Sequence, residues 1–211
     1  MINFNKQTKF DDFTHDALKE HANACQGCAL SSDRQNVVFN SGNPNAELML
    51  IGEGPGQQED EEGVPFVGRA GQLLTKILHS VDIHRDDIYI ANTVKCRPPN
   101  NRTPLPDEML ACSDYLVRQI QLVQPKIICL LGAAAVKAVL GPTESITKIR
   151  GQWITIPVPY MEDELYIMPM FHPSYLLRNA SKEKGAPKWL TWNDMKEVKA
   201  ALSFYDIMNA Q

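Results

Sequence analysis

Residues 48–71, LMLIGEGPGQQEDEEGVPFVGRAG, constrain the fold more than any other stretch of this chain. The first five of them, LMLIG, carry no charge, which predicts a strand that is buried on both faces. Residues 52–56, GEGPG, contain three glycines and a proline, so the backbone must turn sharply after the strand. Because open α/β sheets bind ligands at the carboxyl ends of their strands, this turn and its Glu53 carboxylate form a candidate ligand site.

The rest of the chain alternates between apolar runs typical of strands and segments with helical periodicity. Further strands are predicted over 88–94, 127–131 and 165–171, with a peripheral strand or loop over 153–159. Helices are predicted over 11–24, 68–81, 107–124, 133–140 and 191–208, and a mobile loop over 178–188. This alternation predicts an α/β fold whose mostly parallel sheet is covered by helices on both faces. A length of 211 residues suits one such domain, so a single domain over residues 1–211 is expected.

Composition limits the classes of protein to which the chain can belong. It has no run of 18 apolar residues and no apolar N-terminal signal segment, so a cytoplasmic protein is expected. A net charge of −4 argues against non-specific coating of nucleic acid, although a local basic groove stays compatible with it. The phosphate-binding motifs GxGxxG and GxxxxGK(S/T) are absent, so a nucleotide-cofactor fold has no motif support.

Four of the five cysteines are spaced as a set of metal ligands, with Cys25 and Cys28 in a C-x2-C pair and Cys96 and Cys112 further along. Thiolates are soft ligands, and four of them suit zinc or an iron–sulfur cluster. The spacing differs from the run found in bacterial ferredoxins, and it does not decide between zinc, iron and four unconnected thiols. The fifth cysteine, Cys129, lies in the apolar run IICLLG and is expected to be a core residue.

Three of the predicted strands end near residues that can perform chemistry: Glu53, Asn92 and His172. The carboxyl ends of parallel strands lie along one edge of a sheet, so these side chains can converge there. The Asn92 amide can read a planar polar edge, and His172 can donate a hydrogen bond to a developing anion. Glu53 or Glu59 can orient a water molecule, and Phe66 offers a flat face for stacking. In the simpler structural interpretation, the histidine orders its loop and the phenylalanine belongs to the core.

Several sequence blocks make the chain resemble the family-four, iron–sulfur uracil-DNA glycosylases of the uracil-DNA glycosylase superfamily. The resemblance covers residues 25–178, and its blocks occur in the order typical of that family. The blocks are the C-x2-C pair, GNPNAELMLIGEGPG at 42–56, VPFVGRAGQLL at 64–74, NTVKCRPPNNRTP at 92–104, Cys112 and HPSYLLR at 172–178. Each block is weak by itself, and together they are highly specific.

The resemblance implies a fold, a cofactor and an activity. The expected fold is a three-layer α/β/α sandwich with a central four-stranded parallel sheet. Cys25, Cys28, Cys96 and Cys112 would hold a 4Fe–4S cluster that pins the N-terminal segment to the loop after the second strand. The expected activity is that of a monofunctional DNA repair glycosylase that hydrolyses the N-glycosidic bond of uracil and leaves an abasic site. No lysine nucleophile is implied, and the loop from Cys96 to Cys112 contains no histidine, so neither strand nicking nor covalent capture is expected.

The same resemblance implies how a uracil flipped out of DNA would be bound. Phe66 would stack on the base, and the backbone at Glu53 and Gly54 would lie against it. Asn92 would read the N3–H donor and the O4 acceptor of uracil. Cytosine carries an acceptor and a donor at these positions, so the same amide would leave polar groups unpaired.

For the chemical step, the resemblance implies that His172 hydrogen-bonds the O2 side of uracil and stabilises it as a leaving anion. Glu53 is expected to position the attacking water, with Glu59 as the second candidate. The family-one relatives carry an aspartate in their corresponding GQDPY motif, whereas this chain has Gly54 at that position.

The expected partner is uracil-containing DNA, single- or double-stranded, and the chain is expected to act as a monomer. Lys95, Arg97 and Arg102 lie in the loop after the second strand and would meet DNA phosphates. The turn from Ser174 to Arg178, with Leu176 in its middle, would act as a wedge into the duplex.

Two other functions fit the residues. A phosphoesterase or nucleotide hydrolase would use Glu53, Glu59 and Asp60 to hold divalent metal ions and would therefore depend on metal. A non-catalytic nucleic-acid-binding module would bind DNA without releasing a base. Uracil release in the presence of a chelator would distinguish a glycosylase from both.

Overall fold

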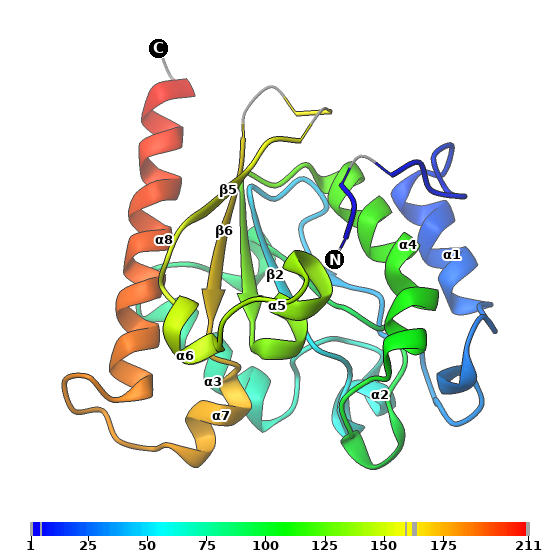
Figure 1. Cartoon of the computed structure of the whole chain (residues 1–211), viewed down its shortest axis with the longest axis horizontal. Helices are drawn as coiled ribbons and strands as arrows, with labels where there is room; N and C mark the ends of the chain where they lie inside the picture. Colours follow the sequence, from blue (N-terminus) through cyan, green and yellow to red (C-terminus); the bar gives the residue numbers. More distant parts are fainter. Residues whose placement is uncertain (1, 5, 159, 162–163, 210–211) are drawn as a thin grey trace.

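A six-stranded mixed sheet lies at the centre of the computed structural model (Figure 1). The structure describes residues 2–4, 6–158, 160–161 and 164–209. The strands are β1 (Ser41–Gly42), β2 (Leu48–Gly52), β3 (Tyr89–Asn92), β4 (Ile127–Leu131), β5 (Ile154–Ile156) and β6 (Leu165–Met170). Their spatial order is β1-β3-β2-β4-β6-β5.

The four inner strands run parallel, which confirms the mostly parallel sheet predicted from the alternation of strands and helices. β2 pairs in parallel with β3 and β4, and β4 pairs in parallel with β6. Every residue of β2, β3 and β4 is buried, which explains why their sequences carry no charge. The expected count of four strands is correct for this centre but incomplete, because β1 and β5 add antiparallel edges to β3 and β6.

Helices occupy the connections between the strands. They are α1 (His15–Asn23), α2 (Gln57–Glu62), α3 (Arg69–His79), α4 (Pro106–Val123), α5 (Ala133–Leu140), α6 (Ile146–Ile149), α7 (Pro173–Arg178) and α8 (Pro187–Asn209). Short 3-10 turns occur at η1 (Ala29–Ser31), η2 (Arg85–Asp87) and η3 (Pro99–Asn101). The five longer helices that the sequence predicts are present, and α2, α6 and α7 are additional. The C-terminal helix begins at Pro187, four residues before the predicted start.

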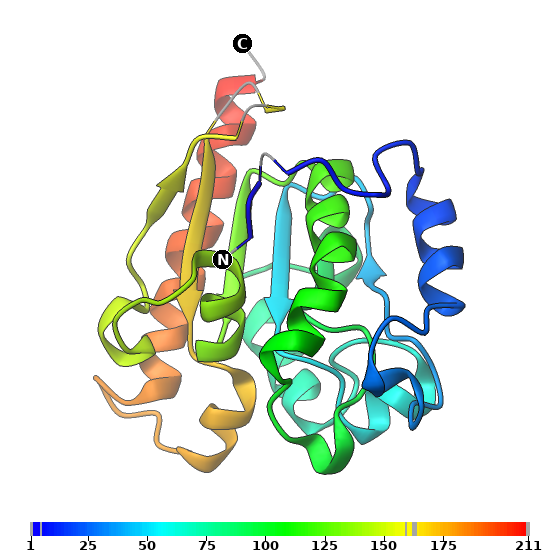
Figure 2. The same cartoon turned by 45° about the vertical axis from the view of Figure 1, so that its right-hand side comes forward.

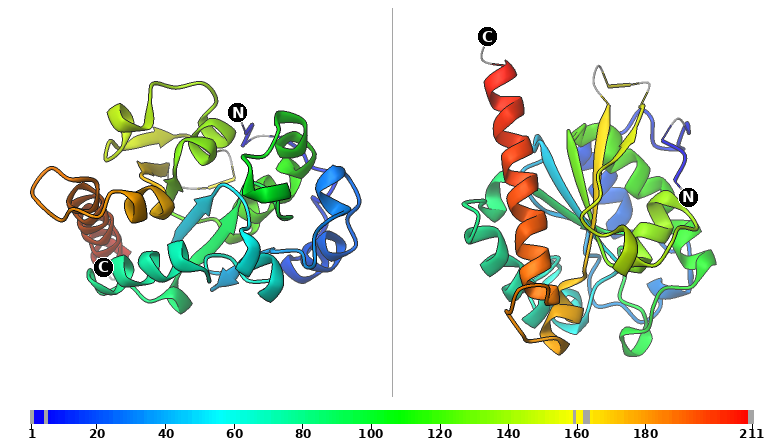
Figure 3. Two further views of the ribbon diagram at one scale, coloured as in Figure 1. Left: turned by 90° about the horizontal axis from the view of Figure 1, so that it is seen from below. Right: turned by 60° about the vertical axis from the view of Figure 1, so that its left-hand side comes forward.

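The helices form layers on both faces of the sheet, as expected. Residues of α4 and α5, including Leu116 and Val136, pack with Met49 on one face. Residues of α3 and α8, including Leu78 and Val198, form the core of the other face. Figure 3 (left) shows α3 on the opposite side of the strands from α4 and α5.

The carboxyl ends of the parallel strands point toward one edge, at the lower side of Figure 2. The turn into α2, the loop with η3 and the short helix α7 gather at this edge (Figures 1 and 2). A third apolar cluster packs α1 against α4 beside the cysteines, and it includes Leu18, Ala22 and Tyr115. The fold therefore places the carboxyl edge of the sheet, where the candidate site is expected, beside the contact between α1 and α4 that carries the cysteines.

Within the described ranges, no helix combines the length and the apolar character that crossing a membrane requires.

Candidate active site

An open cleft lies at the carboxyl edge of the sheet, between the turns that follow β2, β3, β4 and β6. The residues predicted to bind and react with a base all line it: Glu53, Gly54, Glu59, Phe66, Asn92 and His172. The predicted convergence of strand-end residues is therefore observed. Gly132 and Ala133, which follow β4, complete the floor of the cleft.

Phe66 lies at the base of the cleft in an unusual backbone conformation. Its φ angle is 55°, in the left-handed region that an aromatic residue rarely adopts, and its side chain is buried. The ring passes directly over the end of β2, since a Cβ on Gly52 would lie 2.5 Å from Phe66 Cζ. Gly52 is therefore needed for the close approach of the ring to the strand.

Asn92 ends β3 and presents an unused acceptor to the cleft. The residue is 2% exposed, and its side-chain Oδ1 accepts no hydrogen bond from any residue that the structure describes. Such a buried, unpaired oxygen costs free energy unless a ligand or water supplies a donor. The same oxygen lies 2.5 Å from where a Cβ of Gly52 would be, so it sits beside the Phe66 ring.

His172 caps the N-terminus of α7 with its own ring. Its Nδ1 accepts from the backbone N–H of Ser174 at 3.1 Å and lies 2.8 Å from the hydroxyl of that residue. An Nδ1 that accepts a hydrogen bond leaves the proton of a neutral imidazole on Nε2. Burial, helped by the positive charge of Arg178, lowers the pKa of His172 to about 4. The ring is therefore a neutral Nε2–H donor at neutral pH, with its centroid 5.8 Å from that of Phe66.

The two candidate carboxylates differ in how their oxygens are used. The Glu53 carboxylate forms no hydrogen bond or ion pair with any described residue, while its backbone carbonyl accepts from the Thr93 hydroxyl. The Glu59 carboxylate accepts from three backbone N–H groups, those of Gly56 at 3.1 Å, Val67 at 3.1 Å and Gly68 at 2.9 Å. Glu53 is therefore free to bind a water molecule, whereas Glu59 holds the loops on either side of the cleft.

Asp60 does not face the cleft. It is buried at 1% exposure and accepts from the backbone N–H groups of Gln35 and Asn36. Glu59 and Asp60 are both occupied by backbone donors, so the three carboxylates that a phosphoesterase would need do not converge. This geometry counts against a phosphoesterase or nucleotide hydrolase that holds divalent metal ions with these three carboxylates.

Two of the predicted DNA contacts are placed wrongly by sequence reasoning. Lys95 is buried at 2% exposure, and its Nζ donates to the carbonyl oxygen of Asn92 at 2.7 Å, so it does not reach the surface to meet a phosphate. Leu176 is 0% exposed because it forms the inner face of α7, so it does not project as a wedge.

Of the remaining predicted contacts, all except Arg97 line the rim of the cleft. Ser174 and Arg178 line it from α7, and Arg102 lines it from the loop after β3. Arg102 is paired with Glu108 at 2.6 Å, and Arg97 in the same loop donates to Asn101 at 2.8 Å.

Two cations outside the predicted set of DNA contacts also line the cleft, Arg69 and Lys137. Both are exposed and form no ion pair with any described side chain. Arg69 opens α3 and Lys137 lies on α5, which starts directly after β4. The sequence signal that could have identified Arg69 and Lys137 as cleft residues is their position shortly after a predicted strand or glycine turn.

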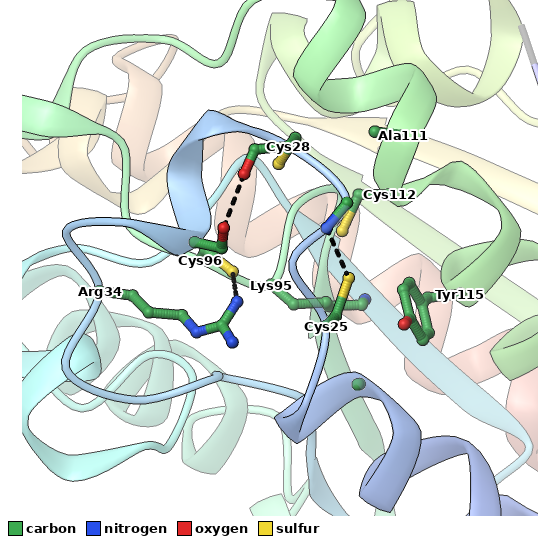
Figure 4. A pocket seen from close by; sticks show the side chains of 11 residues that line it. Cys25, Cys28, Arg34, Lys95, Cys96, Ala111, Cys112 and Tyr115 are labelled. Carbon is green, nitrogen blue, oxygen red and sulfur yellow. Dashed lines mark hydrogen bonds between the residues drawn. The ribbon is translucent and has the colours of Figure 1, made fainter.

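A second, smaller pocket lies behind the cleft at the corner between α1 and α4 (Figure 4). Cys25, Cys28, Cys96 and Cys112 all line it, which brings together the four cysteines that the sequence groups. Across the described ranges, no three His, Cys, Asp or Glu side chains are arranged to hold a single metal ion. Cys129 is fully buried in β4 and takes no part, as predicted.

The walls of this pocket carry positive charge. Arg34 donates from Nη1 to the sulfur of Cys96 at 3.2 Å (Figure 4), and Lys95 is buried beside Cys96 and Cys112. Burial raises the pKa of the Cys112 thiol to about 12, against the opposing effect of the Lys95 ammonium. Four cysteines with two cations among them form a donor set suited to a group that carries net negative charge once thiolates bind it.

Comparison with known proteins gives the same family for most of the chain. Residues 39–196 match the family model described as the uracil DNA glycosylase superfamily. A type-4 uracil-DNA glycosylase of Thermotoga maritima is 47% identical over 79% of this chain and 84% of its own. The type-4 enzyme of Saccharolobus solfataricus is 42% identical over 89% and 86%, and that of Sulfurisphaera tokodaii is 44% identical over 79% and 77%.

Proposed function

The chain belongs to the type-4 uracil-DNA glycosylases of the uracil-DNA glycosylase superfamily, and we propose how its own residues remove uracil from DNA. It is an N-glycosylase that hydrolyses the bond between uracil and the deoxyribose. The base must leave the duplex to reach the cleft, because the reacting bond is inaccessible in the stack. The product is an abasic site with an intact phosphate backbone.

The unpartnered Oδ1 of Asn92 is the single observation that carries this proposal. This acceptor is fixed at the end of β3 and would take the N3–H of uracil, while the Nδ2 amide would donate to O4. Cytosine carries an acceptor where uracil carries N3–H, so its binding would leave the buried oxygen unpaired. A site built on a specific hydrogen bond rejects the wrong partner strongly. Phe66 supports the plane of the base by stacking.

His172 stabilises the leaving group in this proposal. Breaking the N-glycosidic bond moves negative charge onto uracil, and the neutral Nε2–H can donate to the O2 side where that charge develops. The Ser174 N–H fixes the tautomer, because it occupies the other ring nitrogen as a donor. The ring needs no protonation for this role, in agreement with its low pKa.

Glu53 positions the attacking water, and Glu59 does not. The Glu53 carboxylate lines the cleft without a protein partner, so it can accept a hydrogen bond from water and stabilise positive charge on the sugar. The Glu59 oxygens are occupied by three backbone donors, so we assign this residue to holding the loops at Gly56 and Val67.

The cations at the rim of the cleft bind DNA phosphates on either side of the flipped nucleotide. They are Arg69, Arg102, Lys137 and Arg178, joined by the hydroxyl of Ser174. Arg97, in the loop after β3, adds a further phosphate contact outside the rim. Their small number in a chain of net charge −4 predicts a small footprint and salt-sensitive binding.

The four-cysteine pocket fits a 4Fe–4S cluster, which the family's resemblance implies. Cys25, Cys28, Cys96 and Cys112 would be the ligands, and the cluster would supply structural cross-linking of the N-terminal segment to α4 and the loop after β3. Arg34 and Lys95 would offset the negative charge that four thiolates bring.

The test is an end-labelled oligonucleotide with one uracil, incubated with the purified protein in EDTA and then treated with hot alkali. Strand cleavage at the uracil only after alkali is expected, because a glycosylase leaves an alkali-labile abasic site. A matched oligonucleotide with cytosine at that position should stay intact. Cleavage before alkali, or a requirement for added divalent metal, would instead support a nicking or metal-dependent enzyme.

A further inference from the structure

The backbone of Phe66 is held in a conformation that it would not adopt by itself. A left-handed φ of 55° at a bulky residue costs free energy and persists only when the surroundings impose it. Contacts within the protein supply such a constraint at Phe66.

The contacts come from two charged side chains on opposite sides of the loop. Arg85 donates from Nη1 to the carbonyl oxygen of Phe66 at 2.7 Å and from Nη2 to that of Pro65 at 2.8 Å. Glu59 accepts from the N–H groups of Val67 and Gly68. A cation thus satisfies two successive carbonyls and an anion satisfies the next two amides, which fixes the peptide planes on both sides of the Phe66 Cα.

The loop that carries Phe66 also packs closely against α3. A Cβ on Gly71 would lie 1.8 Å from the carbonyl oxygen of Phe66, so the loop packs directly on the bare backbone of the helix. Arg85 is itself anchored from behind, since Nη1 also donates to Thr75 Oγ1 at 3.2 Å, and that hydroxyl donates to the Gly71 carbonyl.

We infer that Arg85 is a positioning residue that sets uracil affinity by fixing the ring of Phe66, with Glu59 as its counterpart on the other side of the loop. Arg85 lies in η2, behind the loop and outside the cleft, so it acts through Phe66 and does not touch the base. Its forked guanidinium matches two adjacent carbonyls, which a lysine ammonium cannot do with the same geometry. This inference rests on the proposed stacking role of Phe66.

The experiment measures the affinity of the cluster-loaded protein for two oligonucleotides. One contains 2′-fluoroarabino-uridine, whose fluorine blocks cleavage while keeping the uracil base, and the other contains a tetrahydrofuran abasic analogue. The ratio of the two affinities reports the contribution of the base alone. Stacking on one aromatic ring changes affinity by about 5- to 150-fold, which sets the scale of the expected effect.

Arg85→Met should reduce this ratio by about 5- to 10-fold, with the affinity for the abasic analogue changed less than about 2-fold. In a Phe66→Ala background, Arg85→Met should produce little further change, because the two residues act through one ring. The matched control is Arg118→Met, which also removes a guanidinium bound to a backbone carbonyl, that of Phe13, and should leave the ratio unchanged.

Each alternative result has a defined meaning. Equal losses of affinity for both oligonucleotides, or an additive effect in the Phe66→Ala background, would overturn the inference in favour of a general structural role. An unchanged ratio in the Phe66→Ala variant would show that Phe66 does not stack on uracil, and this result would overturn the inference about Arg85. It would leave the proposed function intact, because uracil excision by the native chain is measured separately. If Arg85→Met does not fold, Arg85→Lys carries the test, with an expected reduction of about 3-fold and an unchanged ratio as the contrary result.

Discussion

We predict that His172 is neutral at pH 7 and gains a proton only near pH 4. The ring is half-buried at the cleft, and its Nδ1 accepts from the Ser174 N–H. Loss of solvation and the positive charge of Arg178 lower the pKa of His172 to about 4, from an ordinary value of about 6.5. At pH 7 about one imidazole in a thousand would then carry a charge, compared with about a quarter for an unperturbed histidine.

The same shift makes the stability of the protein depend on pH in one direction. Between pH 6.5 and 4 the unfolded chain binds a proton at His172 that the folded chain does not bind, so the free energy of unfolding falls as the pH falls. A pKa shift of this size lowers the free energy of unfolding by about 3 kcal/mol in total, and the full decrease is reached only below pH 4. Above pH 6.5 the group contributes nothing to the pH dependence.

The measurement is a titration of the histidine ring nitrogens by long-range 1H–15N correlation spectra between pH 8 and 4. His172 is assigned by comparison with His172→Gln, which leaves the other four histidines in place. The spectrum of the native chain should show the Nε2–H tautomer of His172 and no titration until the pH approaches 4. Chemical denaturation at pH 7 and pH 5 should show a loss of stability that His172→Gln lacks.

A midpoint near 6.5, or a proton on Nδ1, would refute this reasoning. The first result would mean that the ring is solvated. The second would mean that Ser174 accepts from the ring instead of donating to it, so that Nε2 has no proton to offer to uracil.

Three further predictions follow from contacts in the two pockets. Asn92→Ala should lower kcat/KM for uracil excision by about 10³-fold while the melting temperature stays close to that of the native chain, because the lost group is the proposed reader of the base; near-normal kinetics would refute the recognition role. Gly52→Ala introduces a Cβ 2.5 Å from both Asn92 Oδ1 and Phe66 Cζ, so excision should fall by about 10²-fold or more at a stability cost of about 1–3 kcal/mol. Cys25→Ser replaces a proposed soft ligand by a hard one and should remove the visible absorbance of the proposed cluster and lower the soluble yield, whereas Cys129→Ser should leave that absorbance unchanged.

The sequence predicts the inner part of the fold well, because buried parallel strands have a distinctive composition. LMLIG and IICLL could be assigned to strands without any structural information, and both end within a residue of the prediction. The edge strand β1 escaped because it is two residues long and lies in a segment that is typical of a turn, whereas β5 lies within the peripheral strand or loop predicted over 153–159. The helix α2 escaped because its residues, QQEDEE, are polar throughout and give no apolar face.

The cleft could be predicted only as far as topology determines it. Strand ends at one edge of a sheet must converge, so Glu53, Asn92 and His172 were found from their positions alone. The roles of individual carboxylates could not be deduced in this way. Whether Glu59 faces water or three backbone donors depends on how residues 56 and 67 come together in space, and no local pattern encodes that contact.

Lys95 shows why a cluster of basic residues in the sequence is not a basic surface in the fold. It lies between Asn92 and Arg97 in a loop with several basic residues, yet its backbone continues from a buried strand and its side chain turns inward. There its Nζ donates to the Asn92 carbonyl, while its neighbour Cys96 lines the cysteine pocket. A single buried cation therefore joins Asn92, the proposed reader of uracil, to the cysteine pocket. Burial lowers the pKa of Lys95 to about 8, and negative charge on Cys96 and Cys112 opposes this shift. The thiolates of the proposed cluster would therefore stabilise the ammonium that donates to the end of β3, and we expect a disrupted cysteine pocket to disturb the placement of Asn92.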